Sequence, residues 1–105
     1  MGRIVAVAYK PKKGSVEALQ KLLEKHVQIL REQGLASERE PIIMRSKDGI
    51  HIEVFEWKSA DAIEKAHTNK VVQELWQEFA EVCDYVPLSS ASEVANLFSE
   101  FESIN

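Results

Sequence analysis

Two histidines fall on the apolar faces of expected helices. His26 is in line with Leu23 and Leu30, at the three- and four-residue spacing of a helix face. His67 follows a second apolar stripe, which includes Ile63. Imidazole exchanges a proton near neutral pH, and burying it without a hydrogen-bond partner is unfavourable. We therefore expect His67 and His26 to be candidate acid–base residues, with His67 preferred. The competing interpretation is that both are hydrogen-bonded packing residues.

Four aromatic side chains are expected to face the same space as these histidines. Phe55 and Trp57 share one face of a strand, Trp76 lies on the inward stripe of a helix, and Tyr9 lies on the first strand. A pocket with aromatic walls and few polar groups suits a flat, apolar small molecule. We expect these four residues to line a ligand pocket, although the tryptophans are also typical of a packed core.

Other chemistries find little support in the sequence. The three histidines, even with a carboxylate such as Glu53, match no compact metal-ligand spacing. His51 alternates on a strand, and we expect it to face solvent or another copy of the chain. Cys83 is the only cysteine and lies on an apolar stripe, which predicts an unreactive packed thiol. Because Gly-rich phosphate loops are also missing, we expect neither a metal nor another cofactor.

Length and charge exclude several classes of protein. The chain has 105 residues, which fits a single domain spanning 1–105. Its formal net charge is −4 and no basic patch stands out, which argues against a nucleic-acid partner. The longest apolar run near the start has five residues, Ile4–Ala8, too short for a signal peptide or a membrane span. We expect a cytoplasmic protein with no membrane partner.

Strand and helix patterns alternate along the chain. The expected elements are strands at 3–10, 41–47 and 50–57, and helices at 15–34, from 59 to a break at 68–69, and across 72–83. Ser59 is a suitable N-cap, and Ser90 with Glu93 resembles a capping box for a short helix to about residue 97. For the last strand we favour 98–104 over 85–88, because Pro87 lacks a backbone donor.

The order strand, helix, strand, strand, helix, strand is the split βαβ plan. It predicts an α+β, ferredoxin-like sandwich, in which helices cover one face of a four-stranded antiparallel sheet. The first strand is apolar on both sides, so the second face of the sheet needs cover. We expect a homodimer with sheets packed face to face, a dimeric α/β barrel. The competing interpretation is a monomer whose sheet surface is partly apolar.

Three neighbouring segments resemble a known family. The stretch Ile52–Trp57, the helix start Ser59–Ile63 and the following His67 are similar to the antibiotic-biosynthesis monooxygenase domains of the dimeric α/β-barrel superfamily. The resemblance extends from Arg3 to about Phe79 and implies a pocket between helices and sheet. That superfamily includes cofactor-free oxygenases of aromatic substrates, haem-degrading enzymes, isomerases and members without an assigned reaction.

The same resemblance narrows the expected function. The first strand has no asparagine, and His67 precedes Trp76, whereas haem-degrading members carry that asparagine and the reverse order of tryptophan and histidine. The resemblance therefore implies a cofactor-independent monooxygenase acting on a small aromatic or phenolic substrate. The alternative is a non-enzymatic, small-ligand-binding or stress-related dimeric protein. A titratable group facing an open cavity would favour the enzyme.

Overall fold

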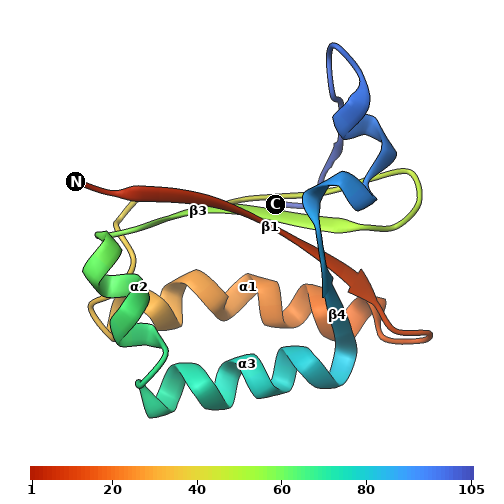
Figure 1. Ribbon diagram of the computed structural model, residues 1–105. Helices are drawn as coiled ribbons and strands as arrows, with labels where there is room; N and C mark the ends of the chain where they lie inside the picture. The colour runs from red at the N-terminus through yellow and green to blue at the C-terminus, as the bar shows by residue number, and fades with distance from the viewer.

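The computed structural model describes residues 1–105, which form three α-helices and five strands (Figure 1). In chain order these are β1 (Arg3–Pro11), α1 (Val16–Glu32), β2 (Ile42–Arg45), β3 (His51–Trp57), α2 (Ala60–Ala66), α3 (Lys70–Val82), β4 (Cys83–Val86) and β5 (Glu102–Ser103). Two short 3-10 turns lie between the last two strands, at Leu88–Ser90 and Ser92–Ala95. The chain is therefore an α+β domain, as the alternating patterns predict.

The strands form one antiparallel sheet in the order β4-β1-β3-β2-β5. The long strands β1 and β3 are neighbours, with Val7 opposite Glu53 and Tyr9 opposite His51. Because successive side chains of a strand point to opposite faces, these four residues share one face of the sheet. The β2–β3 hairpin turns at Gly49, whose positive φ of 89° suits glycine.

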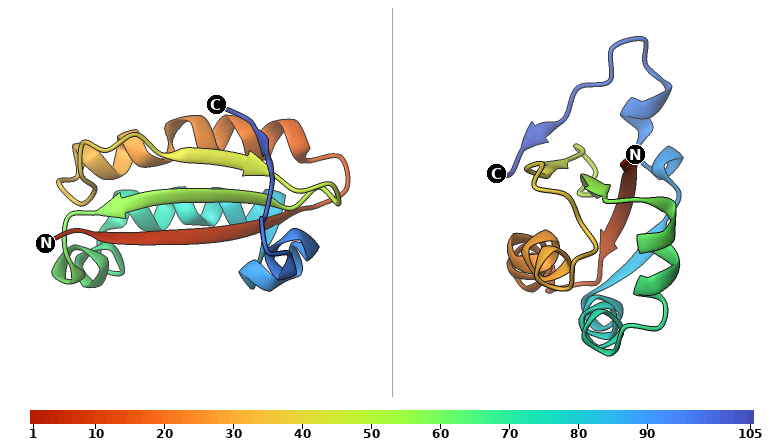
Figure 2. Two further views of the ribbon diagram at one scale, coloured as in Figure 1. Left: turned by 90° about the horizontal axis from the view of Figure 1, so that it is seen from above. Right: turned by 90° about the vertical axis from the view of Figure 1, so that its left-hand side faces the viewer.

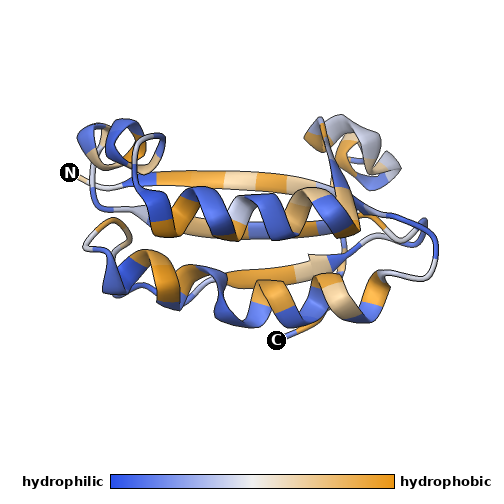
Figure 3. Ribbon diagram, turned by 90° about the horizontal axis from the view of Figure 1, so that it is seen from below, coloured by the Kyte–Doolittle hydropathy of each residue, from blue (hydrophilic) through white to orange (hydrophobic).

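Helices α1 and α3 lie side by side across that face, which we call the helix face (Figures 1 and 3). Their apolar stripes supply the core and their charged residues point outward. The fully buried apolar side chains of the two helices are Leu19, Leu23, Leu30, Val72 and Phe79. The α2 helix begins as predicted, since Ser59 Oγ accepts a hydrogen bond from the Ala62 backbone N–H at 3.1 Å.

The position of the closing strand differs from our prediction. The strand on the other side of β1 from β3 is Cys83–Val86, with Tyr85 opposite Tyr9. It is not the segment 98–104. Pro87 does not prevent this pairing, because it follows the last paired residue of an edge strand. Segment 98–104 contributes only Glu102–Ser103, which pairs with β2 at the opposite edge. The sheet consequently has five strands instead of four.

The expected capping box does not form either. Glu93 Oε2 accepts a hydrogen bond from the Lys47 backbone N–H at 2.8 Å, in the β2–β3 turn. Two 3-10 turns replace the predicted short helix, and Ser90 ends the first of them. The long-range contact to the hairpin thus takes the carboxylate that a local cap would have used.

The opposite side of the sheet, which we call the open face, is only partly covered. The C-terminal segment crosses it near one end of the strands (Figure 2). Ala91 and Phe101 pack there against Ile52. Beyond that cover Ile4 is 61% exposed and Ile42 is 57% exposed. On the open face of the first strand Ile4 and Ala6 are therefore exposed within one chain, and only Ala8 is buried.

Candidate functional site

His26 is held inside the domain by the apolar stripe of α1. Its side chain is 3% exposed, and the ring packs edge-on against Phe55 at 5.4 Å and Phe79 at 5.0 Å between centroids. Nδ1 lies 2.9 Å and 3.0 Å from the two carboxylate oxygens of Glu53. The helix thus delivers the imidazole to a carboxylate at the centre of the sheet.

Glu53 is a fully buried carboxylate on β3. Burying a carboxylate without hydrogen-bond partners is strongly unfavourable, and Glu53 has two side-chain donors. Besides His26 it accepts a hydrogen bond from the Tyr9 hydroxyl at 2.7 Å. Burial and the charge of Glu53 raise the pKa of Tyr9 above its ordinary value of 10.0, so the phenol stays protonated and donates.

Trp76 completes this chain of hydrogen bonds from α3. Its indole Nε1 lies 3.2 Å from His26 Nε2. An indole N–H can only donate, so Nε2 of His26 is the acceptor and Nδ1 carries the proton that is donated to Glu53. The hydrogen-bond pattern therefore assigns a neutral imidazole in the Nδ1–H tautomer, with its lone pair on the side of Trp76.

A cavity of about 300 Å³ lies beside this network, between the helix face and α3. Its walls come from three strands, β1, β3 and β4, and from the two helices α1 and α3. The lining residues are Val5, Val7, Tyr9, His26, Phe55, Trp57, Trp76 and Tyr85. His26 is the one lining residue that is not hydrophobic. The volume is at the small end for ligand pockets, which fits a molecule of one or two fused rings.

The four aromatic residues singled out in the sequence all line this cavity. Tyr9, Phe55, Trp57 and Trp76 line the cavity together with the imidazole of His26, which is the combination of an acid–base group and aromatic walls expected from the sequence. Tyr85 on β4 also lines the cavity. It was not predicted to do so, because the closing strand was expected at 98–104. Burial, with smaller contributions from Cys83 and Glu53, raises the pKa of Tyr85 to about 12, so it is neutral in ordinary buffers.

His67 occupies a different position from the one expected. It caps the C-terminus of α2, its side chain is exposed, and it does not line the cavity. Its ring stands edge-on to Trp76 at 5.9 Å between centroids. The inward stripe of α2 ends at Ala66, one residue too early for His67 to reach the interior. The preference for His67 over His26 is therefore corrected.

His51 also departs from expectation, because it is fully buried on the helix face. One ring nitrogen lies 3.0 Å from the Gly49 carbonyl oxygen and the other 3.0 Å from the Gln20 amide. Burial lowers the pKa of His51 below its ordinary value of 6.5. Both nitrogens have partners within the chain, so this histidine has a structural role.

Glu53 is the residue of the site that the sequence analysis missed as a partner for histidine. The signal was present, since strict alternation along β3 puts Glu53 on the same face as Phe55 and Trp57. A charge at such a position must be paired inside the domain. Pairing with a residue 27 positions away is set by the packing of α1 on the sheet, which spacing in the sequence does not reveal.

Cys83 is buried at the start of β4, and its Sγ lies 3.2 Å from the Phe79 carbonyl oxygen. Burial and the nearby Asp84 raise the pKa of the Cys83 thiol to about 11. The thiol is therefore protonated at neutral pH and is a weak nucleophile.

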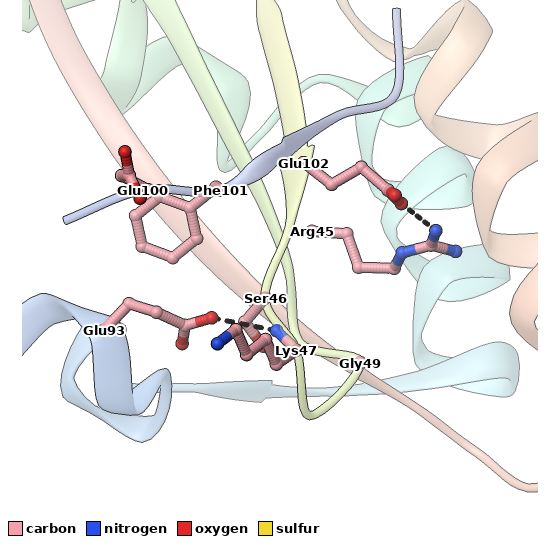
Figure 4. A pocket seen from close by; sticks show the side chains of 8 residues that line it. All are labelled: Arg45, Ser46, Lys47, Gly49, Glu93, Glu100, Phe101 and Glu102. Atoms are coloured by element: carbon pink, nitrogen blue, oxygen red, sulfur yellow. Dashed lines mark hydrogen bonds and ion pairs between the residues drawn. The ribbon is translucent and has the colours of Figure 1, made fainter.

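A larger hollow of about 580 Å³ lies on the other side of the sheet, between the β2–β3 turn and the C-terminal segment (Figure 4). Two of its charged side chains have partners within the chain, whereas Oε1 of Glu93 is buried without a hydrogen-bond partner. Arg45 pairs with Glu102, and Glu93 is tied to the Lys47 backbone. Phe101 is its one hydrophobic lining residue, so it offers little to an aromatic ligand.

Three further observations concern metal binding, membrane spans and similarity to known proteins. No group of three His, Cys, Asp or Glu side chains is gathered closely enough to hold a metal ion. None of the helices combines the length and the apolar character needed to cross a bilayer. A scan against protein-family models found no match, and searches of curated proteins and of solved structures found none either.

Proposed function

We propose that the chain is a cofactor-independent oxygenase of a small phenolic substrate, with His26 as the general base in the cavity. The observation that carries this proposal is the contact between His26 Nδ1 and the buried Glu53 carboxylate at 2.9 Å. A carboxylate on Nδ1 fixes the tautomer, keeps the lone pair on Nε2 and stabilises the imidazolium that forms when a proton is taken up. Tyr9 secures the carboxylate from its other side.

The reaction needs no group beyond the substrate, oxygen and a base. His26 Nε2 takes the phenolic proton, and the electron-rich phenolate then reacts with O₂ at the ring carbon opposite the oxygen. That carbon loses its hydrogen and gains a carbonyl oxygen, the phenol becomes the second carbonyl, and the other oxygen atom leaves as water. The substrate supplies all four electrons, so the balance is dihydroxynaphthalene plus O₂ to hydroxynaphthoquinone plus water. The apolar walls exclude water from the charged intermediates.

The resemblance of residues 52–67 to the antibiotic-biosynthesis monooxygenase domains supports the same reaction class. A second candidate function is non-enzymatic binding of a small apolar ligand, as in a stress-related dimeric protein. One contact favours that alternative: the indole of Trp76 occupies Nε2 of His26, so the base is not free in the unliganded chain.

Oxygen uptake with 1,5-dihydroxynaphthalene separates the two candidates. We expect the wild-type protein to consume oxygen and form the yellow naphthoquinone, and His26→Gln to reduce the rate by about 10²–10⁴-fold. His67→Gln is the matched control, because His67 is exposed and outside the cavity, and it should keep the rate within about twofold. Binding without oxygen uptake by the wild type would favour the ligand-binding alternative, and equal rates in both variants would remove His26 as the base.

We also propose that the working form is a homodimer joined through the open face. Ile4 and Ile42 leave apolar surface on that face. Leu97 is 93% exposed and Phe98 is 82% exposed in the C-terminal segment that projects above it (Figure 1). Exposed apolar side chains of this kind are typical of an interface, and a second copy offers a matching surface.

A further inference from the structure

We infer that Trp76 is a second functional group of the cavity: the hydroxyl of the ligand inserts between the indole Nε1 of Trp76 and Nε2 of His26. The indole would then hold the ligand oxygen while the imidazole receives its proton. This inference rests on the proposed function in one respect, since it takes the cavity beside His26 as the ligand site. It adds a requirement for a hydroxyl group and a role for a residue that otherwise serves as a wall.

The contact between the two rings has the polarity that a hydroxyl can bridge. The indole donates, Nε2 accepts, and they lie 3.2 Å apart. A hydroxyl both donates and accepts, so it can donate to Nε2 and accept from Nε1–H. With normal hydrogen bonds on each side the two nitrogens would separate to roughly 4.5 Å. The rings therefore need to part by a little over 1 Å, which replaces one hydrogen bond with two.

Trp76 is the ring that can move. His26 is anchored on Nδ1 by Glu53 and enclosed by Phe55 and Phe79. Trp76 is only half-buried, and its one hydrogen bond is the bond to His26. It also contacts the ring of His67, which is exposed and can move aside. Opening the contact thus displaces an indole at the surface and leaves the buried pair intact.

Ligands without a hydroxyl cannot make this exchange. An ether or ketone oxygen only accepts, so it would satisfy the indole and leave Nε2 unpaired. A carboxylate would bring a second negative charge near the buried Glu53. A neutral phenol avoids both penalties. After its proton passes to His26, the oxygen keeps the indole N–H as the donor that stabilises its negative charge.

Two tryptophans in the same cavity provide a matched pair of variants. Trp76→Phe removes the N–H that contacts His26 and keeps an aromatic wall. Trp57→Phe makes the same chemical change on β3, where the indole stands 6.4 Å from Trp76 between ring centroids and makes no hydrogen bond to His26. A difference between the two variants therefore reports the N–H and not the loss of ring area.

The test compares the affinities of 1-naphthol and 1-methoxynaphthalene, in which a methyl group replaces the hydroxyl hydrogen. We expect the wild type to bind 1-naphthol at least about 10-fold more tightly, Trp76→Phe to reduce that ratio by about 3- to 10-fold, and Trp57→Phe to leave it unchanged. Equal ratios in the three proteins, or no binding of either probe by the wild type, would overturn the inference.

Oxygen uptake distinguishes this failure from failure of the proposed function. If the hydroxyl preference depends on Trp76 but the wild type consumes no oxygen with 1,5-dihydroxynaphthalene, the oxygenase proposal fails and the role of Trp76 stands. If oxygen is consumed while the ratio is insensitive to Trp76→Phe, the oxygenase stands and Trp76 is only a wall.

Discussion

On the helix face of the sheet, polar side chains are buried and partnered, whereas on the open face apolar side chains are exposed. Glu53, His26 and His51 each have hydrogen-bond partners within the chain. Ile4 and Ile42 are exposed, although isoleucine side chains are usually buried. Adjacent positions of the same strands thus meet opposite surroundings. The helix face is complete within one chain, and the open face is the part that a second copy would complete.

We expect the largest loss of stability from removing the carboxylate at the centre of the helix face. Glu53→Ala should lower the free energy of unfolding by about 3–5 kcal/mol, because it leaves the Tyr9 hydroxyl and His26 Nδ1–H buried without an acceptor. Urea unfolding followed by tryptophan fluorescence measures the change.

The control for that variant is a glutamate on the open face of the same strand. Glu56 is half-buried and pairs at the surface with Arg39, so Glu56→Ala should have a much smaller effect. A similar loss of stability in both variants would mean that the buried network contributes no more than a surface pair.

The next effect is on assembly through the open face. At micromolar concentration we expect the wild type to sediment at twice 11.9 kDa and the double variant Ile4→Glu/Ile42→Glu at 11.9 kDa. Unpaired carboxylates in an interface should weaken the dimer by at least about 100-fold. The double variant should remain folded, because both side chains are exposed within one chain.

Val71→Glu is the matched control for assembly. Val71 is also an exposed apolar residue, 44% accessible, but it lies in the first turn of α3, away from the open face. This variant should remain dimeric. A wild type that sediments as a single chain at micromolar concentration would contradict the homodimer.

The sequence predicts which residues lie on the helix face better than it predicts which strand closes the edge of the sheet. Alternation in β3 and the stripe of α1 put Phe55, Trp57 and His26 on the correct sides, because both patterns have a fixed period. The closing strand was misplaced because β4 is four residues long and its pairing depends on where α3 ends. His67 was misplaced for a related reason: α2 stops at Ala66, before the face pattern reaches it.

The hydrogen bonds of the site could not be predicted from the sequence, for a different reason. Tyr9, His26, Glu53 and Trp76 come from four elements, and their hydrogen bonds join residues 27, 44 and 50 positions apart. Periodicity predicts which face a side chain takes but not its partner on another element. The composition of the cavity wall was predictable, and the order of its hydrogen bonds was not.

The two faces of the sheet should also differ in how the free energy of unfolding depends on pH, although this change is smaller. Burial lowers the pKa of His51 on the helix face, so between that value and 6.5 the unfolded chain binds a proton that the folded chain does not. Stability must therefore fall as pH drops below about 6.5, by at most about 1.4 kcal/mol per pH unit. On the other side of the sheet, hydrogen bonds lower the pKa values of Glu56 and Glu93, whose stabilisation is lost only as pH falls below 4.5.

Unfolding free energies measured between about pH 7 and about pH 5.5 isolate the contribution of the helix face. His51→Gln removes the titrating ring and keeps a group that can bond Gln20 and the Gly49 carbonyl, so it should flatten the decline. His67→Gln replaces an exposed histidine outside the helix face and serves as the control, which should leave the decline as it is. If His51→Gln declines as steeply as the wild type, burial of His51 is not the source, and the pH response of the helix face must come from another of its groups.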